Sequence, residues 1–285
     1  MLRITLMLLV VLLNACSMNK LTVRASMPMV EGGMEALYRE NDLQLAESAF
    51  GPNIELMEGM LINDPENRQL REYAAQAYYG YAFGFVEDQD SQRAGRLYRR
   101  GMRHGLQALR DTGLDISVTD STLDQLRADV ERLDKAAIPA LFWTASCWAK
   151  WIDINRDDVA AIGELPRAVI LMEKVLELDE QYFLAGPHIF MAVYHGGRSP
   201  MLGGNFQLSD QHFNKARALT KNKLLVIDVL QAQYLERQRF DQNKFHSLLT
   251  AVLGASDDLY PEQALVNAIA KSRAKKLLEK EHQWF

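Results

Sequence analysis

Cysteine is scarce in this sequence, which has Cys16 and Cys147 among its 285 residues. This excludes the dense disulfide framework that holds many small secreted domains together. Cys147 lies in the segment LFWTASCWAKW, which is rich in small and aromatic residues, so we expect a buried thiol there and not a reactive one. The fold must therefore be held together by packing.

The sequence also lacks an apolar run long enough to span a membrane at its N-terminus. The apolar stretch there follows Arg3 and extends only from Ile4 to Leu13. A bilayer span needs roughly 20 apolar residues, so this stretch suits a secretory signal better than a membrane helix. It ends in Leu-Asn-Ala-Cys, which resembles a bacterial lipobox with an unusual asparagine at its middle position. We predict a signal peptide over residues 1–15 and lipidation of Cys16. An ordinary signal peptide, cut nearby, is the alternative.

The residue after the predicted lipidation site is Ser17 and not aspartate, which in Gram-negative lipoproteins favours the outer membrane. We therefore expect a lipid-anchored protein on the periplasmic side of the bacterial envelope. Residues 16–33 are predicted to form the lipid anchor and a flexible tether. No linker rich in proline, glycine or serine follows, so residues 34–285 are predicted to form a single helical domain.

Positive charge is not in excess, because the chain has a net charge of −5 at pH 7. Removal of residues 1–15 would remove one further positive charge, Arg3. This balance excludes a nucleic-acid partner. The predicted C-terminal helix, residues 261–284, carries Lys271, Arg273 and other basic residues, which we expect on a solvated face. Contact of these residues with anionic lipid is the alternative.

Motifs of catalytic chemistry are missing as well. His188 and His195 lie seven residues apart on one predicted helix, whereas zinc pairs are usually spaced more closely and need a third ligand. Gly203 and Gly204 are not followed by the Gly-Lys-Ser/Thr of a phosphate loop, and no GxSxG motif occurs. We predict no enzyme activity, no cofactor and no metal site.

The sequence does contain internal repetition. Helices rich in small and aromatic residues alternate with helices that carry a small, a large and a small residue on one face, such as Ala94, Tyr98 and Gly101. Small residues let a neighbouring helix approach closely, and stacked neighbours complete a core that one helix pair cannot. We predict an all-α, tetratricopeptide-like solenoid of helical hairpins with about ten to thirteen helices.

One glycine-rich loop, GGRSPMLGG at residues 196–204, connects two predicted helices. We expect the first helix to begin at Pro187 and the second to have Ser209 as its N-cap. The guanidinium of Arg198 can bind a carboxylate of a ligand or partner, or it can bond to nearby helix carbonyls. Both alternatives stay open from the residues alone.

Two predicted helices are crowded with aromatic residues, and most of these should lie in the core. Aromatic side chains beyond what the core needs can line a groove or channel of a solenoid. The aromatic residues concerned are Tyr78, Tyr79, Tyr81, Phe83 and Phe85 on one helix, and Trp143, Trp148 and Trp151 on the other.

Several segments together resemble the T component of tetratricopeptide-associated TRAP transporters, the TatT-like lipoproteins. They include YYGYAFGFVE at residues 78–87, LFWTASCWAKW at 141–151, Gly-Pro-His at 186–188 and PMLGG at 200–204. The resemblance implies a periplasmic helical lipoprotein that associates with a TRAP solute-binding protein, has a cleft or pore and tends to form homotrimers. The marked family positions fall on Tyr81, Trp143, Trp148, Pro187, His188, Gly203 and Gly204. The loop departs from the family pattern because Asn205, and not an acidic residue, follows Gly204.

These observations favour a non-enzymatic accessory lipoprotein that docks a periplasmic solute-binding protein and passes a small organic solute. A scaffold lipoprotein that organises envelope proteins, without handling solute, is the alternative. The candidate residues for binding a ligand or partner are Tyr81, Phe85, Trp143, Trp148, His188, Arg198, Gly203 and Gly204.

Overall fold

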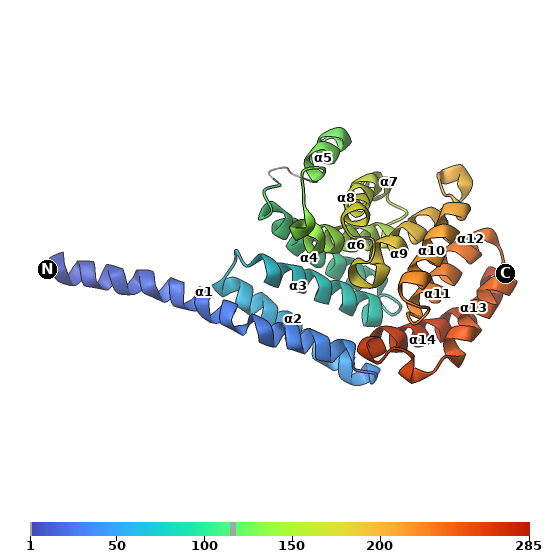
Figure 1. Cartoon of the computed structure of the whole chain (residues 1–285), viewed down its shortest axis with the longest axis horizontal. Helices are drawn as coiled ribbons and strands as arrows, with labels where there is room; N and C mark the ends of the chain where they lie inside the picture. The colour runs from blue at the N-terminus through green and yellow to red at the C-terminus, as the bar shows by residue number, and fades with distance from the viewer. Residues whose placement is uncertain (1, 115–117) are drawn as a thin grey trace.

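The computed structural model describes residues 2–114 and 118–285, with side chains from Met18 onward. All regular elements in these ranges are helical, which confirms the all-α prediction (Figure 1). Cys16, the predicted lipidation site, lies outside the residues whose side chains are described. In the part with described side chains, no helix is both long enough and apolar enough to cross a membrane.

The helices follow one another with short connections. The α-helices are α1 (Leu2–Tyr38), α2 (Leu43–Asn63), α3 (Arg68–Tyr81), α4 (Ser91–Arg110), α5 (Leu123–Val130), α6 (Ile138–Ile154), α7 (Val159–Gly163), α8 (Leu165–Leu178), α9 (Tyr182–Gly196), α10 (Phe206–Leu219), α11 (Val226–Leu230), α12 (Arg237–Arg239), α13 (Gln242–Gly254), α14 (Ala264–Glu279) and α15 (Glu281–Trp284). Two π-helical segments, η1 (Ala82–Val86) and η4 (Gln231–Glu236), continue α3 and α11.

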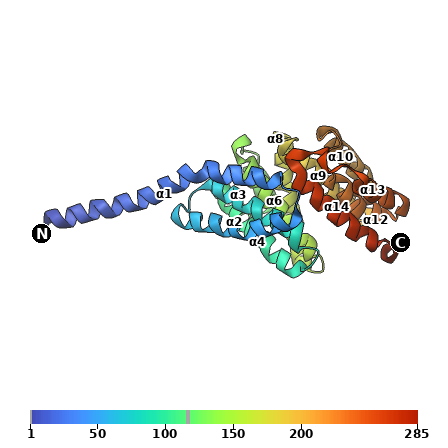
Figure 2. The ribbon, with the colours of Figure 1, turned by 90° about the horizontal axis from the view of Figure 1, so that it is seen from below.

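The segment expected to be a flexible tether differs from that expectation, because residues 18–33 belong to the long helix α1. Val23, Met27 and Met34 recur at helical spacing and are buried against the body of the protein. An ion pair of 2.9 Å between Arg24 Nε and Asp64 Oδ2 adds a polar contact to the end of α2. Figure 2 shows α1 entering the body from one side and then running along α2.

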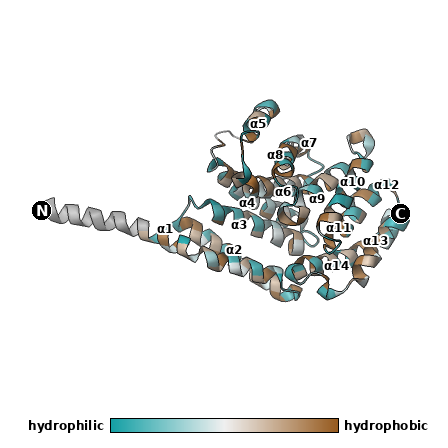
Figure 3. Ribbon diagram, in the orientation of Figure 1, coloured by the Kyte–Doolittle hydropathy of each residue, from teal (hydrophilic) through white to brown (hydrophobic). Residues whose placement is uncertain are grey.

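Consecutive helices pack against each other in chain order, from α2 on α3 through α4, α6, α8 and α9 to α10. Small residues permit the closest of these approaches. A Cβ atom at Gly105 would lie 2.3 Å from Thr144 Oγ1, and one at Gly101 would lie 2.7 Å from Cys147 Sγ. Cys147 itself is fully buried, as expected for a core thiol, and burial raises its pKa. Figure 3 shows apolar and polar residues alternating along the helices, as amphipathic packing requires.

The hairpin around the glycine-rich loop differs in detail from the expected one. The range of α9 begins at Tyr182, but Phe183–Ala185 have left-handed backbone angles, so its regular part follows Ala185, close to the expected start at Pro187. Helix α10 has Asn205 as its N-cap, whose side chain accepts a hydrogen bond from the Leu208 N–H. The expected cap, Ser209, lies one turn inside α10, where its hydroxyl donates to the Ala192 carbonyl at 2.8 Å. The capping prediction was wrong because Asn205 offers the same chemistry one turn earlier.

The C-terminal helix α14 returns to the N-terminal helices and packs against α1 and α2. Leu265 and Ile269 join the apolar cluster formed by those helices. Arg273 does not lie on a solvated face, as the sequence suggested, but is 4% exposed and donates to the Phe83 carbonyl at 2.9 Å. The carboxylate of Glu87, 3.3 Å from Arg273, compensates the buried charge. This contact closes the array of helices around an internal cavity.

Candidate functional site

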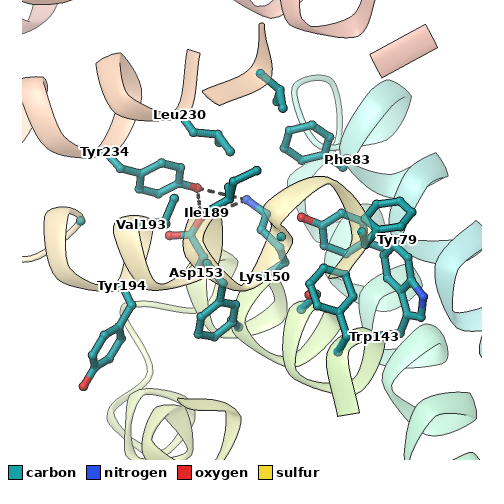
Figure 4. A pocket seen from close by; sticks show the side chains of 18 of the residues that line it. Tyr79, Phe83, Trp143, Lys150, Asp153, Ile189, Val193, Tyr194, Leu230 and Tyr234 are labelled. Atoms are coloured by element: carbon teal, nitrogen blue, oxygen red, sulfur yellow. Dashed lines mark hydrogen bonds and ion pairs between the residues drawn. The ribbon is translucent and has the colours of Figure 1, made fainter. Parts of the chain in front are cut away.

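The cavity has a volume of ≈ 840 Å³, and α1, α3, α6, α9, η4 and α14 contribute to its wall. Most of its lining is apolar or aromatic, with a few polar groups on one side (Figure 4). Volumes of about 300–1,000 Å³ and linings of this kind are typical of sites for small molecules.

Aromatic rings form one wall of the cavity. Tyr79 lies with its ring centre 5.6 Å from that of Trp143, and Phe83 stacks on Tyr79 at 6.0 Å. Phe183 from α9 packs edge-on against Trp143 at 4.6 Å. The spacing of Tyr79 and Phe83 places both on one face, and Figure 4 shows them on the same side of the cavity as Trp143.

The backbone beside this wall has an unusual conformation. Phe183, Leu184 and Ala185 have φ values of 43°, 62° and 59°, in the left-handed region that non-glycine residues avoid. Each such residue costs roughly 1–2 kcal/mol, and strain of this kind gathers at functional sites. Gly186 follows, where a Cβ atom would lie 2.5 Å from the Phe142 ring. Phe183 and Leu184 thus reach the cavity through a strained, left-handed backbone conformation.

A cluster of charged groups lies on the other side of the cavity. Lys150 Nζ is 2.8 Å from Glu87 Oε1, 3.1 Å from Asp153 Oδ2 and 3.1 Å from the Tyr234 hydroxyl. The Tyr234 hydroxyl donates to Asp153 Oδ2 at 2.6 Å, as Figure 4 shows. Tyr234 lies in π-helix η4, and Glu87 directly follows π-helix η1. Both π-helical segments therefore supply a partner of Lys150, in keeping with their frequent occurrence at functional sites.

The charges of this cluster are stabilised by one another. Burial lowers the pKa of Lys150, but the carboxylates of Glu87 and Asp153 outweigh it and hold the pKa well above the usual value. Burial raises the pKa of Asp153, but Lys150 and Arg156 outweigh it and lower the pKa to about 2. Each of the three donors of Lys150 has an acceptor. The cluster is thus ionised at neutral pH and has no proton donor or acceptor poised near pH 7.

Arg198 lines the cavity without a carboxylate partner in the described ranges. Its Nε donates to the Tyr194 carbonyl at 3.1 Å, and its guanidinium lies 4.0 Å from the centre of the Tyr194 ring. Its Nη2 is buried and has no hydrogen-bond partner in the described part of the chain. The loop around it needs glycine, because a Cβ atom at Gly204 would lie 1.9 Å from the Arg198 carbonyl oxygen, and Gly203 has a φ of 81°. Nε of Arg198 is thus bonded and its Nη2 is inaccessible, so an anion in the cavity can meet only the remaining nitrogen, Nη1.

Of the candidate residues from the sequence, Trp143 and Arg198 line the cavity. Trp148 is fully buried in the core, where its Nε1 donates to Glu164 Oε2 at 2.7 Å. Tyr81 at the end of α3 and Phe85 in η1 do not line the cavity, but both pack against the ring of Phe50, which does. Gly203 and Gly204 shape the loop of Arg198 and do not line the cavity themselves.

His188 faces away from the cavity, in a group with other polar side chains. Its Nδ1 lies 2.8 Å from His212 Nδ1, and its Nε2 lies 3.1 Å from Glu180 Oε2. Burial and the neighbouring His188 and His195 lower the pKa of His212 to about 4. No group of three or more side chains in the described residues has the arrangement of a metal site. The contact between His188 and His212 thus connects α9 to α10.

Sequence reasoning did not find Lys150, Asp153, Tyr234 or Phe183. One signal was present for Lys150, because it is the only charged residue of the apolar segment at residues 141–151. A lysine inside such a segment must have anionic partners when it is buried. Asp153 has a local signal, since it lies three residues after Lys150 on the same helix. Glu87 and Tyr234 come from distant parts of the chain, and no local pattern identifies them.

Comparison with known families gives one match. The family model described as TRAP transporter T-component matches residues 39–285, which include every residue of the cavity lining except Met34, Leu37 and Tyr38. No curated protein matches the chain.

Proposed function

Because the chain belongs to the family of TRAP transporter T-components, we propose that it docks the solute-binding protein of a TRAP-type transport system. We further propose that its cavity holds a small organic solute during transfer. The observation that carries this proposal is the cavity of ≈ 840 Å³ with a largely apolar and aromatic wall. The protein acts without catalysis, as a lipoprotein anchored through Cys16 to the periplasmic face of the outer membrane, and assembles as a homotrimer.

The lining indicates the chemistry of the solute. Aromatic rings such as Tyr79 and Trp143 favour an apolar body. Arg198 adds a positive charge that no carboxylate of the described residues neutralises, so it can attract an anionic group of a solute. The Lys150 cluster is already balanced, so it does not compete for the anion. A mainly apolar solute with one acidic group fits this arrangement.

The mouth of the cavity offers a surface for the solute-binding protein. Ile162 and Leu202 line the cavity, yet they are 45% and 74% exposed, and the adjacent Met201 is 96% exposed. Exposed apolar side chains that gather at one place mark interaction surfaces. A protein docked on these residues would cover the mouth and receive solute without its passage through bulk water.

The test is a pull-down from periplasmic extract with the form that starts at Ser17, followed by mass spectrometry of bound proteins and released small molecules. We expect a TRAP solute-binding protein at stoichiometric yield, together with a mainly apolar acid. Recovery of envelope assembly proteins alone would support a scaffold function and contradict the proposal.

Two variants separate docking from solute binding. Val193→Trp places a large ring in the cavity at a lining position that Figure 4 shows beside Asp153, so solute binding should weaken while the binding protein is retained. Leu56→Trp, at a site on α2 that is 58% exposed, outside the lining and away from the proposed docking residues in the chain, is the control and should retain both. Equal solute recovery from the two variants would show that the cavity is not the binding site.

A further inference from the structure

An exposed apolar surface lies at the end of the body where α1 enters. Met18 and Leu21 on α1 are 66% and 68% exposed, and Ile62 near the end of α2 is 83% exposed. Two ion pairs show that these residues share one end of the molecule. Lys20 Nζ lies 2.7 Å from Glu66 Oε2, and Arg24 Nε lies 2.9 Å from Asp64 Oδ2.

One continuous helix joins this end of the body to the N-terminus. Helix α1 runs without a break from Leu2 to Tyr38, and its first part projects from the packed helices (Figures 1 and 2). The sequence of that part contains the apolar stretch 4–13 and Cys16. Since an α-helix rises 1.5 Å per residue, Cys16 precedes Lys20 by about 6 Å along the axis. Either an acylated Cys16 or a retained apolar stretch therefore holds this end within a few helical turns of the bilayer.

We propose that Met18, Leu21 and Ile62 form a membrane-contact surface, which inserts between lipid headgroups and fixes the orientation of the body. The turn between α2 and α3 then faces the membrane. The proposal rests on attachment of the N-terminus to the membrane, and it does not depend on solute transport.

The charges around this surface suit a lipid bilayer. The carboxylates of Asp64 and Glu66 are paired with Arg24 and Lys20, so they do not present free negative charge to anionic headgroups. The aliphatic stems of Lys20 and Arg24 can lie along the interface while their charged ends keep these ion pairs. Apolar side chains flanked by basic ones are typical of segments that bind at the membrane surface.

The depth of single side chains tests the proposal. The full chain, reconstituted in vesicles of phosphatidylethanolamine and phosphatidylglycerol, carries an environment-sensitive fluorophore on Leu21→Cys, Ile62→Cys or Val159→Cys. Cys147 is fully buried and does not react, and the chain without an introduced cysteine sets the background. Val159 is the control because it matches Ile62 in exposure, at 83%, but lies on α7, far along the chain from this end.

We expect nitroxide-labelled lipids to cause a loss of fluorescence at positions 21 and 62 and no loss at position 159. Met18→Ser in the chain labelled at position 62 should weaken the contact about tenfold, as expected from loss of one inserted apolar side chain. Equal fluorescence at positions 62 and 159 in the presence of these lipids would overturn the proposal. A blue shift at position 62 that is the same with and without vesicles would also overturn it, because it would assign the surface to contact between proteins.

Discussion

The buried Lys150 cluster allows a sharp prediction for Lys150→Met. The substitution keeps the length and most of the volume of the side chain but removes its charge. Glu87 then retains Arg273, at 3.3 Å, as its cationic partner, and Asp153 retains Arg156. Loss of one partner of a buried ion pair usually costs about 3–5 kcal/mol. Because both carboxylates keep a partner, we expect the lower end of that range, about 3 kcal/mol at pH 7.

The cost of Lys150→Met should depend on pH. The pKa of Asp153 is lowered from 3.8 to about 2 in the folded protein, so its ionised form stabilises the fold above pH 3.8. This contribution, about 2 kcal/mol, is lost as the pH falls from about 4 to about 2. In the variant the pKa of Asp153 lies higher, so the carboxyl is protonated earlier and the buried charge disappears. The difference in stability between variant and wild type should therefore shrink in acid.

Urea unfolding followed by circular dichroism at pH 7 and pH 3 measures both effects. Lys20→Met is the matched control, because the Lys20–Glu66 pair is exposed, with 38% and 75% of the two side chains accessible. Solvent screens the charges of an exposed pair, so this control should lose little stability at either pH. The reasoning is refuted if the two variants lose equal stability at pH 7, or if the loss in Lys150→Met is the same at both pH values.

Three further predictions concern single residues. Gly204→Ala places a Cβ atom 1.9 Å from the Arg198 carbonyl oxygen and should lower the melting temperature by several degrees, whereas Gly163→Ala, where a Cβ atom meets nothing within 4 Å, should not. Trp148→Ala should cost about 3–5 kcal/mol in urea unfolding, since the ring is fully buried, and a smaller loss would show that the core collapses around the site. The pKa of His212 is lowered to about 4 in the folded protein, so the unfolded chain binds a proton first and the stability falls as the pH drops from 6.5 towards 4. His212→Asn should make the stability, measured by urea unfolding, depend less steeply on pH in this range. The same pH dependence in variant and wild type would contradict the lowered pKa of His212.

The helical class was predictable because it depends on local features. Small residues recur at helical spacing on faces that meet, as Gly101 and Gly105 do on α4. The closure of the array was not predictable, since Arg273 and Glu87 are separated by 186 residues and no periodicity connects them. In the sequence, Arg273 does not differ from other basic residues of an amphipathic helix, because its partner Glu87 is identified only by the structure. The tetratricopeptide-like order of the hairpins stays a prediction.

The candidate site was predictable where a residue type carries its own chemistry. Trp143 and Arg198 were selected for an aromatic face and a glycine-rich loop, and both line the cavity. Trp148 was selected on the same aromatic pattern, but one helical face points to the cavity and the other to the core, and residue types do not distinguish them. Phe183 reaches the cavity through a left-handed turn, which its sequence disfavours.

What fills the cavity bears on function. The cavity is open to the surface, where the lining residue Leu202 is 74% exposed, so water fills it when no solute is bound. Lys150, Asp153 and Tyr234 provide polar groups for this water where their cluster meets the cavity. Water beside the aromatic wall lacks such partners, and a solute with an apolar body gains affinity when it displaces that water.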